Sequence, residues 1–326
     1  MTTRPLRIVI PGGSGQVGQV LARHLQQRGH HVTVLTRAPY TAEWQTVHWD
    51  GLNPGPWIQS LDGADVCINL AGRSVNCRYH QENRRAIYDS RIGTTRLLGE
   101  VIPSLAIPPR VWLNASTATI YRHATDREMD EATGELGGNE LISRRRYAPD
   151  TWNFSIGVAK DWEAAFFESA TPQTRKVSMR SAITMSPNPG NAFGWLSNIA
   201  RLGLGGTQGS GRQFVSWIHQ SDFTRAVEFL IEHEELNGPV NIASPNPLPN
   251  REFMAELRDA WDRPNGLPAP AFLIEIAAFF LRTESELVLK SRRVVPGRLL
   301  DAGFQFEFPE WPEAAADLVR LYRQRD

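Results

Sequence analysis

The chain of 326 residues has little cysteine, no excess of either charge and no long hydrophobic run. Two cysteines, Cys67 and Cys77, are too few for a disulfide framework and are typical of a reducing compartment. Because 35 Lys and Arg residues balance 35 Asp and Glu residues, no overall basic field favours nucleic acid or an anionic membrane. The apolar stretch from Ala269 to Leu281 contains Glu275 and is too short to span a bilayer. These absences favour a small-molecule partner.

Targeting and metal-binding patterns are also lacking. The first residues show no signal peptide, so we expect a cytoplasmic protein. No spacing of His, Cys, Asp or Glu predicts a metal site. The sequence leaves the oligomeric state open.

A glycine-rich run near the N-terminus is the most informative motif present. It reads Gly12-Gly13-Ser14-Gly15-Gln16-Val17-Gly18, and it lies between an apolar segment, residues 6–10, and apolar residues at helical spacing. This order predicts a strand, a tight turn and a helix. Glycines let backbone N–H groups approach a pyrophosphate, and the helix N-terminus adds partial positive charge. The run predicts a dinucleotide site, with a tight turn that binds nothing as the alternative.

The rest of the chain alternates between apolar, β-branched segments and amphipathic ones. Further strands are expected at residues 31–36, 65–72, 110–117 and 176–184, and helices at 84–101 and 155–167. Continuous apolar runs suit strands covered on both faces, as in a parallel sheet. After Met185 come a loop rich in glycine and proline and predicted helices at 251–261, 272–281 and 310–322.

We therefore predict an α/β protein with a Rossmann-like, doubly wound parallel sheet and a smaller, mostly helical C-terminal domain on the substrate side. Residues 1–185 are expected to form the nucleotide-binding domain, to which residues 213–243 return. Residues 186–212 and 244–326 are expected to form the second domain.

Two strand ends refine the cofactor prediction. The residue after the second strand often distinguishes the cofactors, because a carboxylate there binds the ribose 2′-hydroxyl and repels a 2′-phosphate. This chain has Arg37 at that place, so NADP(H) is favoured over NAD(H), unless Arg37 is only a solvated charge. Asn69-Leu70-Ala71-Gly72 ends a strand at the edge where ligands bind, and its small residues serve either the cofactor or the turn alone.

Several segments together resemble the extended short-chain dehydrogenase/reductase superfamily, the NAD-dependent epimerase/dehydratases. They are the glycine run, Asn69-Leu70-Ala71-Gly72, Ser116-Thr117-Ala118-Thr119-Ile120-Tyr121 and Trp217-Ile218-His219-Gln220-Ser221-Asp222. Nearly the whole chain is similar to the subgroup of epimerase family proteins, or nucleoside-diphosphate-sugar epimerases of the SulA type, which carry a C-terminal domain of unknown function. Segments such as Asp161-Trp162-Glu163-Ala164-Ala165 and Val295-Pro296-Gly297-Arg298 carry that similarity.

The resemblance implies a mechanism with a Ser or Thr after the fifth strand and a Tyr-x-x-x-Lys pair on the next helix. Thr117, or its neighbour Ser116, matches the hydroxyl residue, and Lys160 matches the lysine that binds the nicotinamide ribose. The tyrosine position is Ile156, which cannot transfer a proton. Lys160 is one of only three lysines against 32 arginines, although a solvated surface charge is its alternative interpretation.

Tyr121, Tyr147 and Ser155 are candidate replacements for the missing tyrosine, and topology favours Tyr121. Arg212, in the glycine-rich loop, is a candidate ligand for a substrate phosphate or carboxylate, with a flexible linker as the alternative. Two functions follow. The first is an NADP(H)-dependent oxidoreductase or epimerase that transfers hydride to or from a small hydroxyl or carbonyl substrate, such as a nucleotide sugar. The second is an NADP(H)-binding sensor or protein-interaction module that has lost proton-transfer chemistry.

Overall fold

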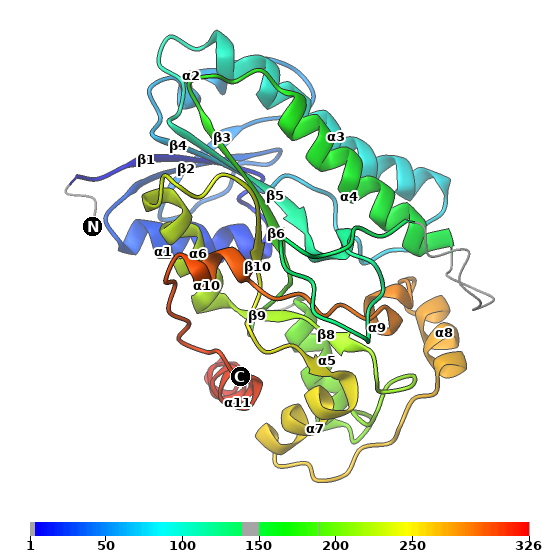
Figure 1. Ribbon diagram of the computed structural model, residues 1–326. Coiled ribbons are helices and arrows are strands. Elements are labelled where there is room, and N and C mark those ends of the chain that lie inside the picture. Colours follow the sequence, from blue (N-terminus) through cyan, green and yellow to red (C-terminus); the bar gives the residue numbers. More distant parts are fainter. Residues whose placement is uncertain (1–3, 139–149, 189, 326) are drawn as a thin grey trace.

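A parallel sheet of seven strands carries the N-terminal part of the fold. In this computed structural model, which describes residues 4–138, 150–188 and 190–325, the strand order is β10-β6-β5-β4-β1-β2-β3 (Figure 1). The strands are β1 (Arg7–Pro11), β2 (His31–Thr36), β3 (Gln45–His48), β4 (Val66–Asn69), β5 (Val111–Thr117), β6 (Arg175–Ser181) and β10 (Gly238–Ile242). Each neighbouring pair runs parallel. The carboxyl ends of β1, β4 and β5 therefore meet at one edge of the sheet.

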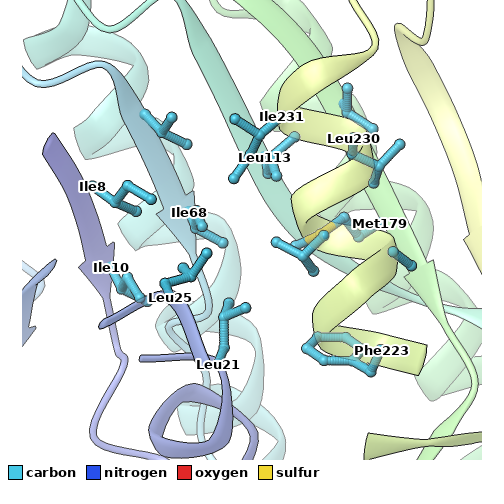
Figure 2. Packing of buried hydrophobic residues seen from close by; sticks show 14 of the residues in the cluster. Ile8, Ile10, Leu21, Leu25, Ile68, Leu113, Met179, Phe223, Leu230 and Ile231 are labelled. Atoms are coloured by element: carbon cyan, nitrogen blue, oxygen red, sulfur yellow. The ribbon is translucent and has the colours of Figure 1, made fainter. Parts of the chain in front are cut away.

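Helices cover both faces of this sheet, as the continuous apolar strands predict. On one face, α1 (Gln16–Gln27) and α6 (Gln220–Glu232) contribute Leu21, Leu25 and Phe223 to a cluster with Ile8 and Ile10 of β1 (Figure 2). The other face is covered by α2 (Ile58–Leu61), α3 (Gln81–Val101), the 3-10 helix η1 (Ile102–Ser104) and α4 (Asp150–Glu168). The doubly wound prediction is confirmed.

A second cluster of helices forms around residues from the C-terminal half. Its core joins α5 (Ala192–Arg201), α7 (Asn250–Ala260) and α11 (Trp311–Arg323), with Trp311 stacked on Phe253 at a ring distance of 4.0 Å. Two short sheets border it: β7 (Ile183–Met185) with β9 (Trp217–His219), and β8 (Phe214–Val215) with β11 (Leu248–Pro249). The remaining short helices are η2 (Ala118–Ile120), α8 (Ala271–Phe280), α9 (Glu286–Leu289) and α10 (Gly297–Asp301). Among the described residues, no helix is long and apolar enough to cross a membrane.

The predicted strand 176–184 is wrong in one respect, because it is two strands in different sheets. β6 ends at Ser181, and the Ala182 N–H then donates to the carbonyl of Ile242 while β7 pairs with β9. The segment 213–243 is also divided between the two parts of the fold. β10 belongs to the large sheet and α6 packs against it, whereas β8 and β9 belong to the short sheets. Leu299 and Phe304 also pack in the core of that sheet. The exact domain boundaries stay a prediction.

Candidate functional site

The glycine run forms the turn between β1 and α1. Gly12 has a φ of 75°, and a Cβ there would lie 2.5 Å from Ala71 Cα, so only glycine fits. Gly18 is equally constrained, because a Cβ would lie 2.5 Å from the Gly13 carbonyl oxygen. The close packing of α1 against the turn therefore requires glycine at both positions.

Gly15 differs, because its added Cβ would meet only the Gly12 oxygen, at 3.7 Å. This residue is the N-cap of α1, and no side chain caps the N–H groups of the helix's first turn. Such N–H groups favour an anion. The turn thus fits the pyrophosphate of a dinucleotide.

The end of β2 lies beside this turn. The Thr36 hydroxyl donates to Ser14 Oγ over 3.1 Å, which places Ser14 against the strand end that Arg37 follows. Arg37 is exposed, and within the described part of the chain it has no hydrogen bond or ion pair. Its guanidinium is therefore accessible to a ligand phosphate, and its role in cofactor choice stays a prediction.

Asn69 shapes the neighbouring turn from inside the protein. Its amide donates to Asn114 Oδ1 over 2.7 Å, and its Oδ1 accepts from the Ala71 N–H over 3.1 Å. Asn69 is fully buried, so it holds the backbone of Leu70 and Ala71 rather than a ligand. A Cβ at Gly72 would lie 3.3 Å from the Arg91 guanidinium carbon, which accounts for the small residue at this end of the motif.

A cavity of about 450 Å³ opens at the carboxyl edge of the sheet. Its walls come from the glycine turn, the ends of β4 and β5, one side of α3 and of α4, and the segment around α9. The lining includes Gln16, Val17, Leu70, Tyr79, Arg91, Ser116, Thr117, Thr119, Phe154, Ser155, Val158, Ala159, Trp162, Glu286, Leu287 and Arg292. The cavity therefore joins the predicted cofactor turn to the predicted reactive hydroxyls.

Thr117 and Ser116 point their hydroxyls in different directions. Thr117 Oγ1 accepts the Thr119 N–H over 3.1 Å, which leaves its own proton for a substrate oxygen in the cavity. Ser116 instead donates to Glu163 Oε1 over 2.7 Å. Of the two alternatives, Ser116 donates its proton within the protein, so Thr117 is the better candidate, and its role toward a substrate stays a prediction.

A buried ion pair explains the orientation of Ser116. Arg180 Nε and Nη2 donate to Glu163 over 2.8 and 2.7 Å, and the Ser178 hydroxyl donates to the same carboxylate. Arg180 also donates to the Tyr121 hydroxyl, which donates in turn to Asn241.

The Tyr121 hydroxyl is thus part of a buried hydrogen-bond network with Arg180 and Asn241. Its ring is 2% exposed and lies outside the cavity lining, and burial raises the pKa of its phenol. The topological argument for Tyr121 as a replacement acid is wrong because its hydroxyl is bonded to Arg180 and Asn241 and the residue does not line the cavity. Tyr147 lies outside the described residues.

The cavity-facing side of α4 does not match the expected Tyr-x-x-x-Lys pair. Ser155, Ala159 and Trp162 line the cavity, whereas Ile156 is 1% exposed beside Gly138. Lys160 follows Ile156 on that adjoining side: a Cβ added to Gly138 would lie 3.2 Å from Lys160 Nζ and 3.5 Å from Ile156. Of the α4 residues that line the cavity, Ser155 is the one that carries a hydroxyl. Ribose binding by Lys160 stays a prediction.

Four polar residues of the cavity have no signal in the sequence motifs. Tyr79 and Arg91 come from the segment around α3, and Glu286 and Arg292 from the segment around α9. Burial lowers the pKa of Arg91 to about 10, and its guanidinium packs over the Trp162 ring at 5.3 Å. Burial also raises the pKa of Tyr79 to about 12, and the charge of Glu286 adds to this rise. Both groups keep their protons at neutral pH.

Arg212 does not reach this cavity. The glycine-rich loop is pinned by backbone hydrogen bonds from Gly206 to Leu267 and from Gly209 to Ala269, and Arg212 is exposed. Arg212 is therefore absent from the lining of this cavity, and its role as a ligand for a substrate phosphate or carboxylate stays a prediction. No group of His, Cys, Asp or Glu within the described ranges could hold a metal ion.

Residues 8–243 match the NAD dependent epimerase/dehydratase family, and residues 269–318 match a domain of unknown function, DUF1731. The chain belongs to the NAD dependent epimerase/dehydratase family. Among relatives, it is 30% identical to human epimerase family protein SDR39U1 over 317 residues, which cover 96% of this chain and all of the human one. It is 28% identical to epimerase family protein YfhF from Bacillus subtilis, over 96% of this chain and 98% of that one.

Two solved structures are similar to this chain in fold. The crystal structure of human SDR39U1 with NADPH has a TM-score of 0.83 and 29% identity, over 97% of this chain and 99% of that one. The nucleoside-diphosphate sugar epimerase from Corynebacterium glutamicum has a TM-score of 0.74 and 26% identity, over 97% of this chain and 59% of that one. The fold and family predicted from the motifs are confirmed.

Proposed function

We propose that this chain is an NADP(H)-dependent oxidoreductase that transfers hydride to or from a small hydroxyl or carbonyl substrate. One observation carries the proposal: a single cavity connects the glycine turn, through Gln16 and Val17, with Thr117 and Ser155. A dinucleotide bound with its pyrophosphate at the turn has a path along this cavity to two hydroxyls. Hydride chemistry is what the cofactor supplies when bound, and the protein positions the substrate oxygen.

The phosphate form of the cofactor is favoured by two independent facts. Arg37 is an exposed cation at the strand end where a carboxylate would select NAD(H). The related human protein SDR39U1 was crystallised with NADPH. A nucleotide sugar is the substrate class to test first, since the related Corynebacterium glutamicum protein is named a nucleoside-diphosphate sugar epimerase.

In the proposed reaction, the Thr117 hydroxyl donates a hydrogen bond to the substrate oxygen and orients it. Trp162 and Phe154 give the cavity apolar walls that limit water around the reacting carbon. Arg91 adds a half-buried cation to the same wall as Trp162, which favours a substrate or cofactor with negative charge.

Transfer of deuterium from labelled cofactor tests this function. The purified protein is incubated with NADPH carrying deuterium on either face of C4 and with a panel of nucleotide sugars, aldehydes and ketones. We expect deuterium to leave from one face only and to appear on the substrate carbon. NADPH binding without deuterium transfer to any compound would contradict the proposal that the protein is an oxidoreductase.

A second candidate, an NADP(H)-binding module without catalysis, is favoured by the side chain at position 156. Isoleucine replaces the phenol that the family mechanism uses, and it is buried rather than facing the cavity. Both candidates predict NADPH binding, but only the oxidoreductase predicts deuterium transfer to a substrate.

A further inference from the structure

The cavity holds a chain of hydrogen bonds between α4 and the C-terminal segment. The Ser155 hydroxyl donates to Glu286 Oε2 over 2.7 Å, although the two residues lie 131 positions apart in the sequence. Both line the cavity, and Figure 1 shows α9, which begins at Glu286, beside the end of α4 that carries Ser155. Neither the family motifs nor the mechanism above uses Glu286.

Glu286 is held as a buried carboxylate. It is 1% exposed, and its Oε1 accepts no hydrogen bond from any described residue. The nearest cation is Arg292, whose Nη2 lies 3.6 Å from that oxygen. Tyr79, from the segment before α3, lines the same cavity. Glu286 thus has an ion-pair partner at Oε1 and the Ser155 hydroxyl at Oε2, so one hydrogen bond joins a cavity hydroxyl to a buried carboxyl group.

Arg292 connects this pair to the other reactive hydroxyl. Its Nε donates to Thr119 Oγ1 over 3.1 Å, and the Thr119 N–H donates to Thr117 Oγ1. Arg292 is buried, and its other donors contact the carbonyls of Glu286 and Lys290. Thr117 and Ser155 are therefore fixed at one cavity by a shared scaffold, half of which comes from the C-terminal segment.

We propose that Ser155 is the catalytic hydroxyl that replaces the missing tyrosine, and that Glu286 acts through it as a proton acceptor and donor. This inference rests on the proposed function. In the oxidation direction, the substrate O–H bond breaks and its proton passes to Ser155 Oγ, while the serine proton passes to Glu286 Oε2. The substrate C–H bond breaks at the same time, its electron pair leaves as hydride to the nicotinamide of NADP⁺, and a C=O bond forms. Carbonyl reduction by NADPH reverses each transfer.

Three variants test the relay, with 4-nitrobenzaldehyde as the first carbonyl probe and NADPH as the reductant. Ser155→Ala and Glu286→Gln are each expected to lower kcat by about 100-fold or more, the usual contribution of a positioned acid or base. Ser178→Ala is the control, because Ser178 also donates to a buried glutamate, Glu163, but lies outside the cavity lining. We expect the control to keep the wild-type kcat.

Two further readouts separate proton transfer from structural damage. Fluorescence titration should give NADPH affinities within about threefold of wild type for all variants, a difference below 1 kcal/mol. We expect a plot of kcat against the fraction of D2O in the solvent to indicate more than one transferred proton in the wild type. The same plot should indicate only one in Glu286→Gln. In a fourth variant, Glu286→Ala, added formate should restore part of the activity that the substitution removes.

The outcomes distinguish the two proposals. Wild-type kcat in Ser155→Ala or in Glu286→Gln overturns the relay and leaves the oxidoreductase intact. An equal loss in Ser178→Ala also overturns the relay, because the effect is then structural. Failure of the wild type to bind NADPH overturns the proposed function itself, and binding without turnover of any carbonyl overturns both.

Discussion

The two walls of the cavity are built on different principles. The wall at β1 and α1 consists largely of backbone: Gly12 and Gly18 leave no room for a Cβ, and the first turn of α1 has no side-chain cap. The opposite wall consists of side chains from distant segments, such as Ser155 on α4 and Glu286 before the C-terminal helices. The first wall can be recognised from local spacing. The second exists only after the chain has folded.

This difference makes the second wall the more dependent on side-chain pairs behind it, such as the buried pair of Glu163 and Arg180, which lies outside the cavity lining. The largest effect is expected for Glu163→Ala, which removes the carboxylate that accepts from Arg180, Ser116 and Ser178. An uncompensated buried guanidinium typically costs about 3–5 kcal/mol. Urea unfolding should show this loss in the free energy of unfolding.

The exposed Glu168 on the same helix is the matched control, and Glu168→Ala should change stability by less than about 0.5 kcal/mol. Equal losses for the two alanine variants would show that α4 does not depend on its contacts with β5 and β6.

The first wall is tested by Gly12→Ala. The new Cβ would meet Ala71 Cα at 2.5 Å in a backbone with φ of 75°, so we expect a loss of about 3 kcal/mol and weaker NADPH binding. Gly29→Ala is the control, because Gly29 has φ of 87° with nothing within 4 Å. It should cost only the left-handed strain, about 1–2 kcal/mol, and leave NADPH binding unchanged.

Much of the fold was predictable from the sequence because its signals are local. The strand, turn and helix around Gly12 to Gly18, and the apolar strands of the sheet, follow from spacing alone. The break after Ser181 was not predictable, because it depends on the pairing of β7 with β9.

The site divides in the same way. The motif singled out Thr117, which lines the cavity, but Tyr121 was misjudged because proximity along the chain does not say which way a side chain points. Its hydroxyl bonds to Arg180 and Asn241, which come from two other strands. Glu286 could not be found from spacing, since its partner Ser155 lies on a different helix.

A smaller effect is expected at the edge of the first wall. Arg37→Asp places a carboxylate beside the predicted 2′-phosphate, so NADPH affinity should fall by about 10–100-fold, or 1.4–2.7 kcal/mol. NADH affinity should stay equal or rise. Fluorescence titration of both cofactors measures the change, with Arg23→Asp, an exposed arginine on α1, as the control for net charge. An unchanged preference in Arg37→Asp would remove Arg37 from the cofactor site.

The smallest effect concerns the support of α1 behind the glycine turn. Glu228 on α6 accepts hydrogen bonds from His24 and Arg28 at the end of α1. The bond with His24 lowers the pKa of Glu228 to about 2, against the opposing effect of burial, and Arg28 adds to the lowering. Because the folded pKa lies below the unfolded value of about 4.5, this stabilisation is present above pH 4.5 and is lost as the pH falls toward 2.

Glu228→Gln should therefore cost about 1–2 kcal/mol at pH 7, less than the full shift implies because Arg28 is half-exposed. The difference from wild type should shrink as the pH falls from 4.5 to 2, because Glu228 takes up its proton in the unfolded chain at a higher pH than in the folded one. Thermal unfolding at stepped pH measures this, and Glu232→Gln, an exposed carboxylate on the same helix, should shift stability equally little at every pH. A Glu228→Gln deficit that persists undiminished at pH 2 would mean that shape, and not charge, joins α6 to α1. The backbone wall of the cavity would then be supported by packing alone, and its contrast with the side-chain wall would be sharper still.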